Sequence, residues 1–173
     1  MKALSLWEPW ATLVRRGLKL YETRGWPMYE SLIDKPLAIH AAKQPFRPDD
    51  WGDELLLQLR ADDVSGPWGY GHILCVVHPG RSITTKAWKD FYRTRVDTLA
   101  DSAVTDKFFD QQIVRFKREF AYGNYADVDS DSGKVRWATP LHDIRVLPEP
   151  IPFRGAQGIF NWPEGDAIYQ ELW

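Results

Sequence analysis

Cysteine is almost absent from this 173-residue chain, because Cys75 is its only one. A single thiol excludes a disulfide within the chain and any zinc site built from cysteines. Cys75 lies inside an apolar run at residues 73–77. Such surroundings are typical of a buried, inert thiol rather than a nucleophile. Cysteine-dependent chemistry is therefore not expected.

Long apolar runs and targeting signals are also lacking. No apolar run is long enough to span a bilayer. Glu8 and Pro9 interrupt the apolar stretch at the N-terminus, so we expect no signal peptide. The sequence shows no internal repeat and no low-complexity tract. We expect a cytoplasmic enzyme or binding module with no membrane partner.

The chain has no excess of positive charge, with 22 Lys and Arg against 24 Asp and Glu, a net charge of −2 and a pI of about 6.1. Proteins that grip a long nucleic acid through its phosphates are usually basic. Any nucleic-acid contact must therefore be local, and a nucleoside-sized ligand fits the charge balance equally well. Trp is abundant, with nine residues. Aromatic side chains pack cores and also stack bases in pockets, and we expect core packing for most of them.

Short strands with helices set between them are the predicted organisation. Alternating or wholly apolar stretches predict strands at residues 2–6, 19–24, 37–42, 73–77, 135–137, 143–147 and 158–162. Helical spacing predicts helices that begin near Pro9, after Asp49 or Asp50, after Thr84 or Thr85, and at about Thr105. Prolines at 148, 150 and 152 indicate an extended edge segment. The order departs from strict βαβ alternation, which favours an α+β fold.

Metal-ligand patterns are weak. Residues 127–133 match a calcium loop only in part, because Gly133 comes one position late and Ala138 stands where the bidentate Glu belongs. We expect a solvated hairpin turn there. The remaining histidines apart from His40 show no metal-ligand spacing: His72, His78 and His142. No metal site and no cofactor is predicted.

Four segments together resemble the ASCH domain family. Residues 5–11 read Ser-Leu-Trp-Glu-Pro-Trp-Ala, similar to the family's opening Ser-hydrophobic-x-x-Pro-aromatic-Ala. Residues 17–24 resemble its Gly-x-Lys-x-x-Glu-x-Arg, and residues 37–43 resemble its Ile-His-Ala-x-Lys strand. Residues 147–158 resemble its Pro-x-x-x-(Lys/Arg)-Gly-x-x-Gly tail. The segments occur in family order, and such agreement is more specific than any one motif.

The resemblance implies an α+β fold built as a PUA-like mixed β-barrel with peripheral helices. It implies a single domain over residues 1–173, with a cleft beside the first helix. Residues 81–134 match no part of the family pattern, so we expect a helical insertion at about 81–121. Within the family, some members cleave single-stranded RNA and some small members hydrolyse the amide of N4-acylated cytidine. Fold alone does not choose between such activities.

Three charged residues are the predicted catalytic group: Lys19, Glu22 and Arg24. Glu22 and Arg24 share a strand face at a spacing of two and lie close enough to pair. A surface ion pair there would contribute little, about 0–1 kcal/mol. The resemblance instead puts them at the mouth of the cleft, with Arg24 holding an anion or carbonyl and Glu22 acting as acid or base. In an ideal strand Lys19 faces away from Glu22, so the two converge only if a bulge or the turn at Gly17 rotates Lys19 inward.

The predicted ligand- or RNA-binding residues are Ser5, Trp7, Trp10, His40, Lys43, Arg154, Gly155 and Gln157. His40 is a core or pocket-wall residue, or a ligand contact for which its small neighbours leave room. Trp7 and Trp10 either stack a base or pack in the core. Lys43 ends the histidine strand within reach of a phosphate, and the glycine-containing loop near 155 lets backbone N–H groups approach a ligand.

Three functions remain open for this cleft. The first is metal-independent cleavage of single-stranded RNA, for which the predicted residues supply a base, an acid and a cation. The second is hydrolysis of N4-acylcytidine, although deacylating members carry a Thr where this chain has Glu22, and Thr23 faces the other way. The third is a non-catalytic module that binds RNA or a modified nucleoside. We expect the hydrolase, with RNA cleavage as the preferred reaction.

Overall fold

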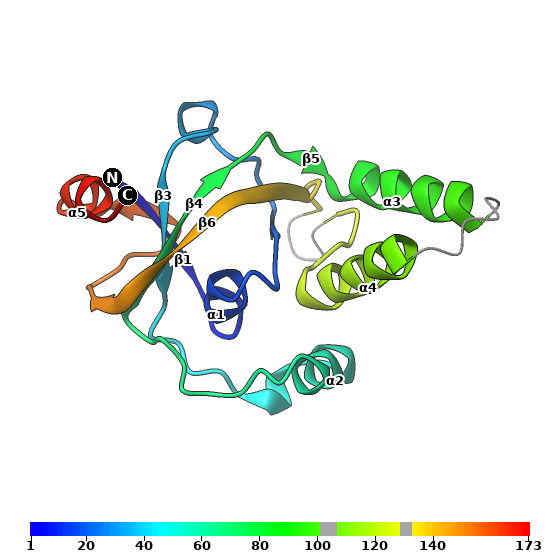
Figure 1. Ribbon diagram of the computed structural model, residues 1–173, viewed down its shortest axis with the longest axis horizontal. Coiled ribbons are helices and arrows are strands. Elements are labelled where there is room, and N and C mark those ends of the chain that lie inside the picture. Colours follow the sequence, from blue (N-terminus) through cyan, green and yellow to red (C-terminus); the bar gives the residue numbers. More distant parts are fainter. Residues whose placement is uncertain (101–106, 129–132) are drawn as a thin grey trace.

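A computed structural model describes residues 1–100, 107–128 and 133–173 (Figure 1). In this part of the chain a mixed sheet runs in the order β2-β6-β4-β3-β1-β7, and β5 adds to β6. The strands are β1 Lys2–Leu6, β2 Tyr21–Arg24, β3 Leu37–Ala41, β4 His72–Pro79, β5 Ile83–Thr84, β6 Trp137–Pro152 and β7 Ile159–Asn161. Among these strands, only β1 and β3 pair in parallel.

The long strand β6 makes the sheet curl. Its first residues pair with β2 and β5, and the remainder pairs with β4 through two register irregularities. Such bulges bend a strand and increase its twist. Figure 1 shows β6 sweeping across the half-barrel from its end near β5 and past β4, with α3 and α4 lying beyond that end. The result is a half-barrel with helices around it, which confirms the predicted α+β fold.

Both faces of the central strands are buried. Side chains on one face form a hydrophobic cluster with α1 (Trp10–Arg15), which contributes Ala11 and Val14. The other face packs against Trp162 and partly buried residues of α5 (Gly165–Leu172). Cys75 is fully buried in the first cluster, and burial raises the pKa of its thiol to about 12. The thiol is therefore inert, as its apolar run predicts.

Glu8 fixes the entry to α1, a role that the sequence did not suggest. The carboxylate is buried and accepts hydrogen bonds from the backbone N–H of Thr12, the hydroxyl of Thr12 and the backbone N–H of Gly69. These bonds satisfy an orphan donor of the first helical turn. The helix ends before Gly17, whose φ of +67° is the left-handed conformation that ends many helices.

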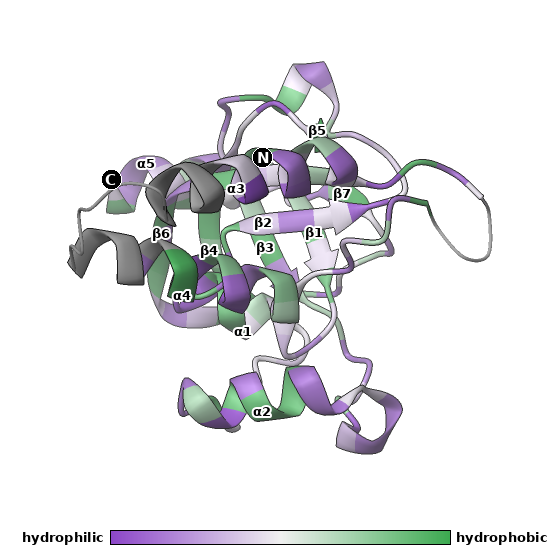
Figure 2. Ribbon diagram, turned by 90° about the vertical axis from the view of Figure 1, so that its right-hand side faces the viewer, coloured by the Kyte–Doolittle hydropathy of each residue, from purple (hydrophilic) through white to green (hydrophobic). Residues whose placement is uncertain are grey.

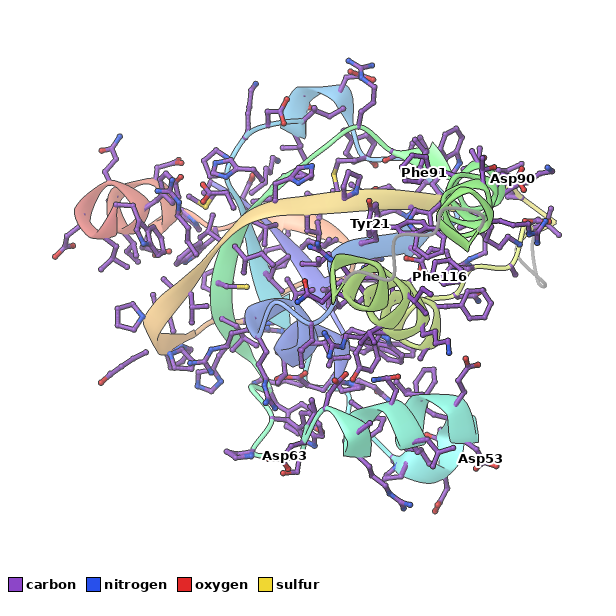
Figure 3. The ribbon with its side chains drawn as sticks, turned by 45° about the vertical axis from the view of Figure 1, so that its right-hand side comes forward. Tyr21, Asp53, Asp63, Asp90, Phe91 and Phe116 are labelled. Atoms are coloured by element: carbon purple, nitrogen blue, oxygen red, sulfur yellow. The ribbon has the colours of Figure 1, made fainter. Side chains whose placement is uncertain are left out.

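Three further helices lie beside the half-barrel: α2 (Asp53–Ala61), α3 (Thr85–Ala100) and α4 (Lys107–Tyr122). Figure 1 shows α3 and α4 projecting on the side opposite α5, and Figure 2 shows α4 between α3 and α2. Trp88 of α3 stacks on Phe116 of α4 and on Tyr125 after it. Tyr21 and Phe116, labelled in Figure 3, pack against this cluster from β2 and α4.

A second set of contacts joins α4 to α2. Arg118 donates two hydrogen bonds to the Asp62 carboxylate, and the Tyr122 hydroxyl donates a third over 2.6 Å. Burial raises the pKa of Asp62, but these bonds more than offset it and leave that pKa below its ordinary value. Charge-assisted bonds of this kind are stronger than neutral ones. The end of α4 is therefore held firmly against the rest of the molecule.

Several expected boundaries differ from the structure. The helix expected after Asp49 or Asp50 begins at Asp53, because Pro48–Asp50 forms a separate 3-10 turn and Trp51 lies before the helix. The late strand expected at 143–147 lies within a longer strand, β6, which begins at Trp137. Of the strand expected at 135–137, only Trp137 belongs to β6, and Val135 makes an isolated bridge to Val128. The proline segment of β6 pairs with β4 alone, consistent with an edge.

Other expectations fall partly outside the described residues. The expected helix start near Thr105 and two aspartates of the 127–133 turn lie there, whereas α4 is described from Lys107. Within the described ranges, no helix has the length and apolar character to cross a membrane.

Candidate functional site

A large cleft opens between α1, β2, the loop at residues 154–158 and the end of α4. Its volume is about 1430 Å³. All eleven residues predicted from the sequence line it: Ser5, Trp7, Trp10, Lys19, Glu22, Arg24, His40, Lys43, Arg154, Gly155 and Gln157. Segments that lie more than a hundred residues apart in the chain therefore meet at one hollow.

Lys19 reaches the cleft because β2 starts later than expected. The strand begins at Tyr21, so Lys19 belongs to the connection after Gly17 rather than to an alternating strand. Its side chain is only 1% exposed, and its ammonium donates to the Tyr21 carbonyl. The turn after α1, rather than a bulge, brings Lys19 to the same hollow as Glu22.

Glu22 and Arg24 form an ion pair, with 2.9 Å between Arg24 Nε and Glu22 Oε1. The Arg24 guanidinium also donates to the Ser5 carbonyl over 2.9 Å and lies 5.4 Å from the centre of the Trp26 ring. Arg24 therefore links β2 to β1 and is fixed on three sides. The Glu22 carboxylate is largely buried, yet only its Oε1 accepts the Arg24 bond.

Ser5 and His40 are neighbours because β1 and β3 pair in parallel with these two residues in register. His40 Nε2 lies 3.2 Å from the Phe153 carbonyl, and its Nδ1 lies 2.9 Å from Ser5 Oγ. A carbonyl can only accept, so Nε2 carries the proton. Burial lowers the pKa of His40 and so favours a neutral ring, although the bond to the Phe153 carbonyl acts in the opposite direction. In a neutral ring with its proton on Nε2, Nδ1 accepts a hydrogen bond from the Ser5 hydroxyl.

The loop at 154–158 covers the His40 ring. The backbone of Gly155 lies directly on the imidazole, so that a Cβ added there would overlap its ring atoms. Both ring nitrogens are already bonded within the protein. His40 is therefore a wall residue that reaches a ligand only through Ser5. The expected alternative of a direct histidine contact does not fit this geometry.

The two tryptophans near α1 have different environments. Trp7 is 53% exposed, and its ring lies edge-on to Trp51 at 6.5 Å. Trp10 packs into two core clusters, and its indole N–H donates to the Tyr122 carbonyl over 2.8 Å. Trp7 therefore offers a ring face to a ligand, while Trp10 ties α1 to the end of α4.

The far wall of the cleft comes from the helical region, which the family resemblance does not cover. The residues there include Lys89 and a run from Phe120 to Ala126. The Arg136 guanidinium joins this wall and donates to the Asn124 and Thr23 carbonyls. Thr23 lines the cleft too, and its hydroxyl accepts the Asn124 N–H.

Glu119 stands behind this wall and is almost fully buried. Its carboxylate accepts the Leu20 backbone N–H and lies 3.5 Å from the Tyr125 hydroxyl. Burial raises the pKa of Glu119, and the charge of Lys19 opposes that shift. Only the cluster of aromatics between Phe116 and Tyr125 could have suggested this wall from sequence, and that pattern is equally typical of core packing.

The cleft is cationic although the chain as a whole is acidic. Among the described residues, its lining has six Lys or Arg side chains and two Glu, against a net charge of −2 for the chain. Lys43 and Arg154 are exposed, and no ion pair of theirs occurs within the described ranges. Where residues are described, no group of three His, Cys, Asp or Glu could hold a metal ion.

Comparison with known proteins relates the whole chain to one fold. No protein-family model matches the sequence. Among solved structures, ASCH from Zymomonas mobilis matches with a TM-score of 0.50 and 11% identity, over 99% of this chain and 93% of that chain. Two point mutants of the Zymomonas mobilis protein match with the same TM-score and 13% identity, covering 99% of this chain and 94% or 96% of theirs. The chain therefore has the ASCH fold, which confirms the fold predicted from its four segments.

Proposed function

We propose that this ASCH-fold protein binds single-stranded RNA in the cleft, with bases stacked on aromatic rings and phosphates held by Lys and Arg. The observation that carries the proposal is a cationic, aromatic-lined hollow in a chain whose net charge is −2. Single-strand sites in proteins combine these two features, a positive groove and rings on which bases stack. Some of the six also have partners within the protein, such as Arg24 with Glu22 and Lys89 with Asp127, whereas Lys43 and Arg154 are exposed to a ligand's charge.

The size of the cleft favours an RNA segment over a single nucleoside. Small-molecule pockets usually have volumes of roughly 300–1,000 Å³, whereas this cleft measures about 1430 Å³. Unpaired RNA is also the form whose bases are free to stack on side chains. A modified nucleoside would occupy only part of the same hollow.

The lining suggests a role for each side chain. Trp7 presents a ring face for stacking, and Lys43 and Arg154 are the exposed cations for phosphates. Glu22 keeps one carboxylate oxygen to accept a base amino group or a ribose 2′-hydroxyl, because Arg24 bonds to the other. The 2′-hydroxyl is the group that distinguishes RNA from DNA.

Fluorescence anisotropy with a labelled eight-nucleotide RNA tests the proposal. The variant is Lys43→Ala/Arg154→Ala, and the matched control is Lys35→Ala/Lys117→Ala, which removes two exposed lysines outside the cleft. Each single-strand phosphate contact contributes about −0.7 to the slope of log affinity against log salt. We expect the cleft variant to lose about 1.4 of that slope and the control to lose none. Equal losses in both variants would contradict the proposal.

Hydrolysis at the same site is a second candidate function. The Glu22 carboxylate, oriented by Arg24, is placed to act as a base toward a ribose 2′-hydroxyl. The 2′-oxygen would then attack phosphorus to form a 2′,3′-cyclic phosphate, and the bond from phosphorus to the 5′-oxygen would break as that oxygen takes a proton from water and leaves as an alcohol. The neighbouring cations Lys19 and Arg24 would stabilise the extra charge on phosphorus.

Deacylation of N4-acylcytidine uses a different group. Ser5 would attack the amide carbonyl as its proton passes to His40 Nδ1, and His40 would return that proton to N4. Water would then hydrolyse the acyl-serine. Product analysis of RNA and of N4-acetylcytidine with Glu22→Gln and Ser5→Ala separates the reactions. RNA cleavage requires loss of product in Glu22→Gln, and deacylation requires loss in Ser5→Ala. If the wild-type protein forms no product, both hydrolase reactions are rejected and the binding proposal stands.

A further inference from the structure

A second hollow adjoins the cleft. Its volume is about 490 Å³, and Lys2, Trp26, Tyr29 and Ser31 contribute to its lining. It shares Gln157 and Gly158 with the cleft, so the two spaces border the same short piece of chain. A strand of RNA that leaves the cleft across Gly158 would enter the second hollow next.

Two stacked aromatic rings form one side of this hollow. The Trp26 and Tyr29 rings lie 5.6 Å apart with an interplanar angle of 18°. Trp26 is half-buried against the main core, whereas Tyr29 is 59% exposed. An exposed ring stacked on an anchored one gains little for folding by itself, but it offers a flat surface that is already in place for a base.

The backbone that carries these rings is held in position. Met28 lies between them in sequence, is buried, and donates its backbone N–H to Ser82 Oγ over 2.8 Å. A platform fixed in advance loses little conformational entropy when a ligand binds. The stacked pair is therefore organised before any base arrives.

Charge in and around the hollow suits a nucleic acid. Lys2 is exposed there, and no Asp or Glu is among the described residues that line it. The nearby Glu30 is paired with Arg81 over 3.1 Å. Arg24 joins the two spaces, because it lines the cleft while its guanidinium lies 5.4 Å from the centre of the Trp26 ring.

We infer that the second hollow is a base-stacking subsite for the same RNA strand, with one nucleobase on Tyr29 and the adjoining phosphate near Lys2. The inference rests on the proposed function, since it requires RNA in the cleft. It adds that the ligand is an oligonucleotide that extends beyond the cleft, not a nucleoside.

The test compares two RNA lengths in competition against a labelled nine-nucleotide RNA. A trinucleotide is short enough to bind within the cleft alone, whereas a nonanucleotide also reaches Tyr29. Tyr29→Ala is expected to weaken the affinity for the nonanucleotide by about 5- to 150-fold, which corresponds to the free energy of one base–aromatic stack. It should leave the trinucleotide within twofold of wild type. Tyr29→Phe keeps the ring and should behave as wild type. Phe91→Ala removes an exposed ring that lines neither hollow and should change neither affinity.

The outcomes separate the two proposals. If wild-type protein binds neither RNA, the proposed function fails and takes the subsite with it. If the wild-type protein binds both RNAs, but Tyr29→Ala weakens neither affinity or weakens both equally, the subsite proposal is wrong and the cleft proposal stands. If Tyr29→Phe also loses affinity for the nonanucleotide, binding depends on the Tyr29 hydroxyl rather than on stacking. That result also overturns the inference.

Discussion

Replacing Gly155 by Ala should damage the wall of the cleft. A Cβ at this position would overlap the His40 ring. The loop around Gly155 cannot move away easily, because backbone hydrogen bonds hold both of its ends. The Phe153 N–H donates to the Gly71 carbonyl, and the Ser5 N–H donates to the Gly158 carbonyl. The ring must therefore turn, and His40 would lose its bonds to Ser5 and to the Phe153 carbonyl.

The size of the effect follows from those two bonds. Each contributes about 1 kcal/mol, and a buried donor left without a partner costs about 1–3 kcal/mol. We expect Gly155→Ala to lower the free energy of unfolding by about 2–4 kcal/mol. Gly25→Ala is the matched control, since a Cβ there meets nothing within 4 Å. It should change stability by less than about 0.5 kcal/mol.

Urea unfolding followed by Trp fluorescence measures both variants. A double variant with His40→Ala tests the cause directly, because a small side chain at position 40 makes room for the added methyl group. Gly155→Ala should then have almost no effect in the His40→Ala background. Full additivity of the two changes, or a Gly155→Ala protein as stable as the Gly25→Ala control, would refute the proposed contact.

Three other changes probe the same site. Arg24→Gln should lower the free energy of unfolding by about 1–3 kcal/mol, because it leaves the buried Glu22 unpaired, with the effect reduced by the 25% exposure of Arg24. Adding Glu22→Gln should restore at least half of that loss, and no restoration in urea unfolding would contradict the ion pair. Stability should also fall as pH drops below 6.5, because the pKa of His40 is lowered by folding and the unfolded chain takes up the proton first. That loss continues until folded His40 protonates too, so His40→Gln should flatten the profile just below about pH 6.5; an unchanged profile would rule His40 out. Trp10→Phe removes the bond to the Tyr122 carbonyl, about 1 kcal/mol, and should speed amide hydrogen exchange in residues 119–126. Unaltered exchange there would show that Trp10 does not hold the end of α4.

Local patterns predicted most of the strands and the residues that line the cleft, but they missed β5 and α5. The spacing of Glu22 and Arg24 predicted their shared face, and the wholly apolar run at 73–77 predicted the buried strand β4. The four segments in order resembled the ASCH family, and that resemblance predicted the fold. These features depend on neighbours in sequence, which is why they could be read without coordinates.

Long-range contacts could not be predicted in the same way. The bond between Ser5 and His40 depends on the parallel register of β1 and β3. The position of Lys19 depends on where β2 begins, and strand ends are poorly determined by pattern. The wall that α4 contributes depends on packing between helices. The spacing of the aromatic residues at 116–125 does not say which other element they pack against.

The helical region acquires a structural role from these contacts. The carboxylate of Asp62 holds Arg118 and Tyr122, and the Tyr122 carbonyl accepts the Trp10 indole N–H. The end of α4 and the residues after it line the cleft together with the 154–158 loop. This arrangement makes α4 part of the proposed RNA site.

Photo-crosslinking of a 4-thiouridine-containing single-stranded RNA, followed by mapping of the linked peptides, tests the central proposal most directly. The account predicts adducts on the peptides that contain Trp7, the run from Phe120 to Ala126 and the loop at 154–158. Excess unlabelled RNA should abolish all of them. Specific adducts confined to α5, or spread evenly over the surface, would contradict RNA binding in the cleft.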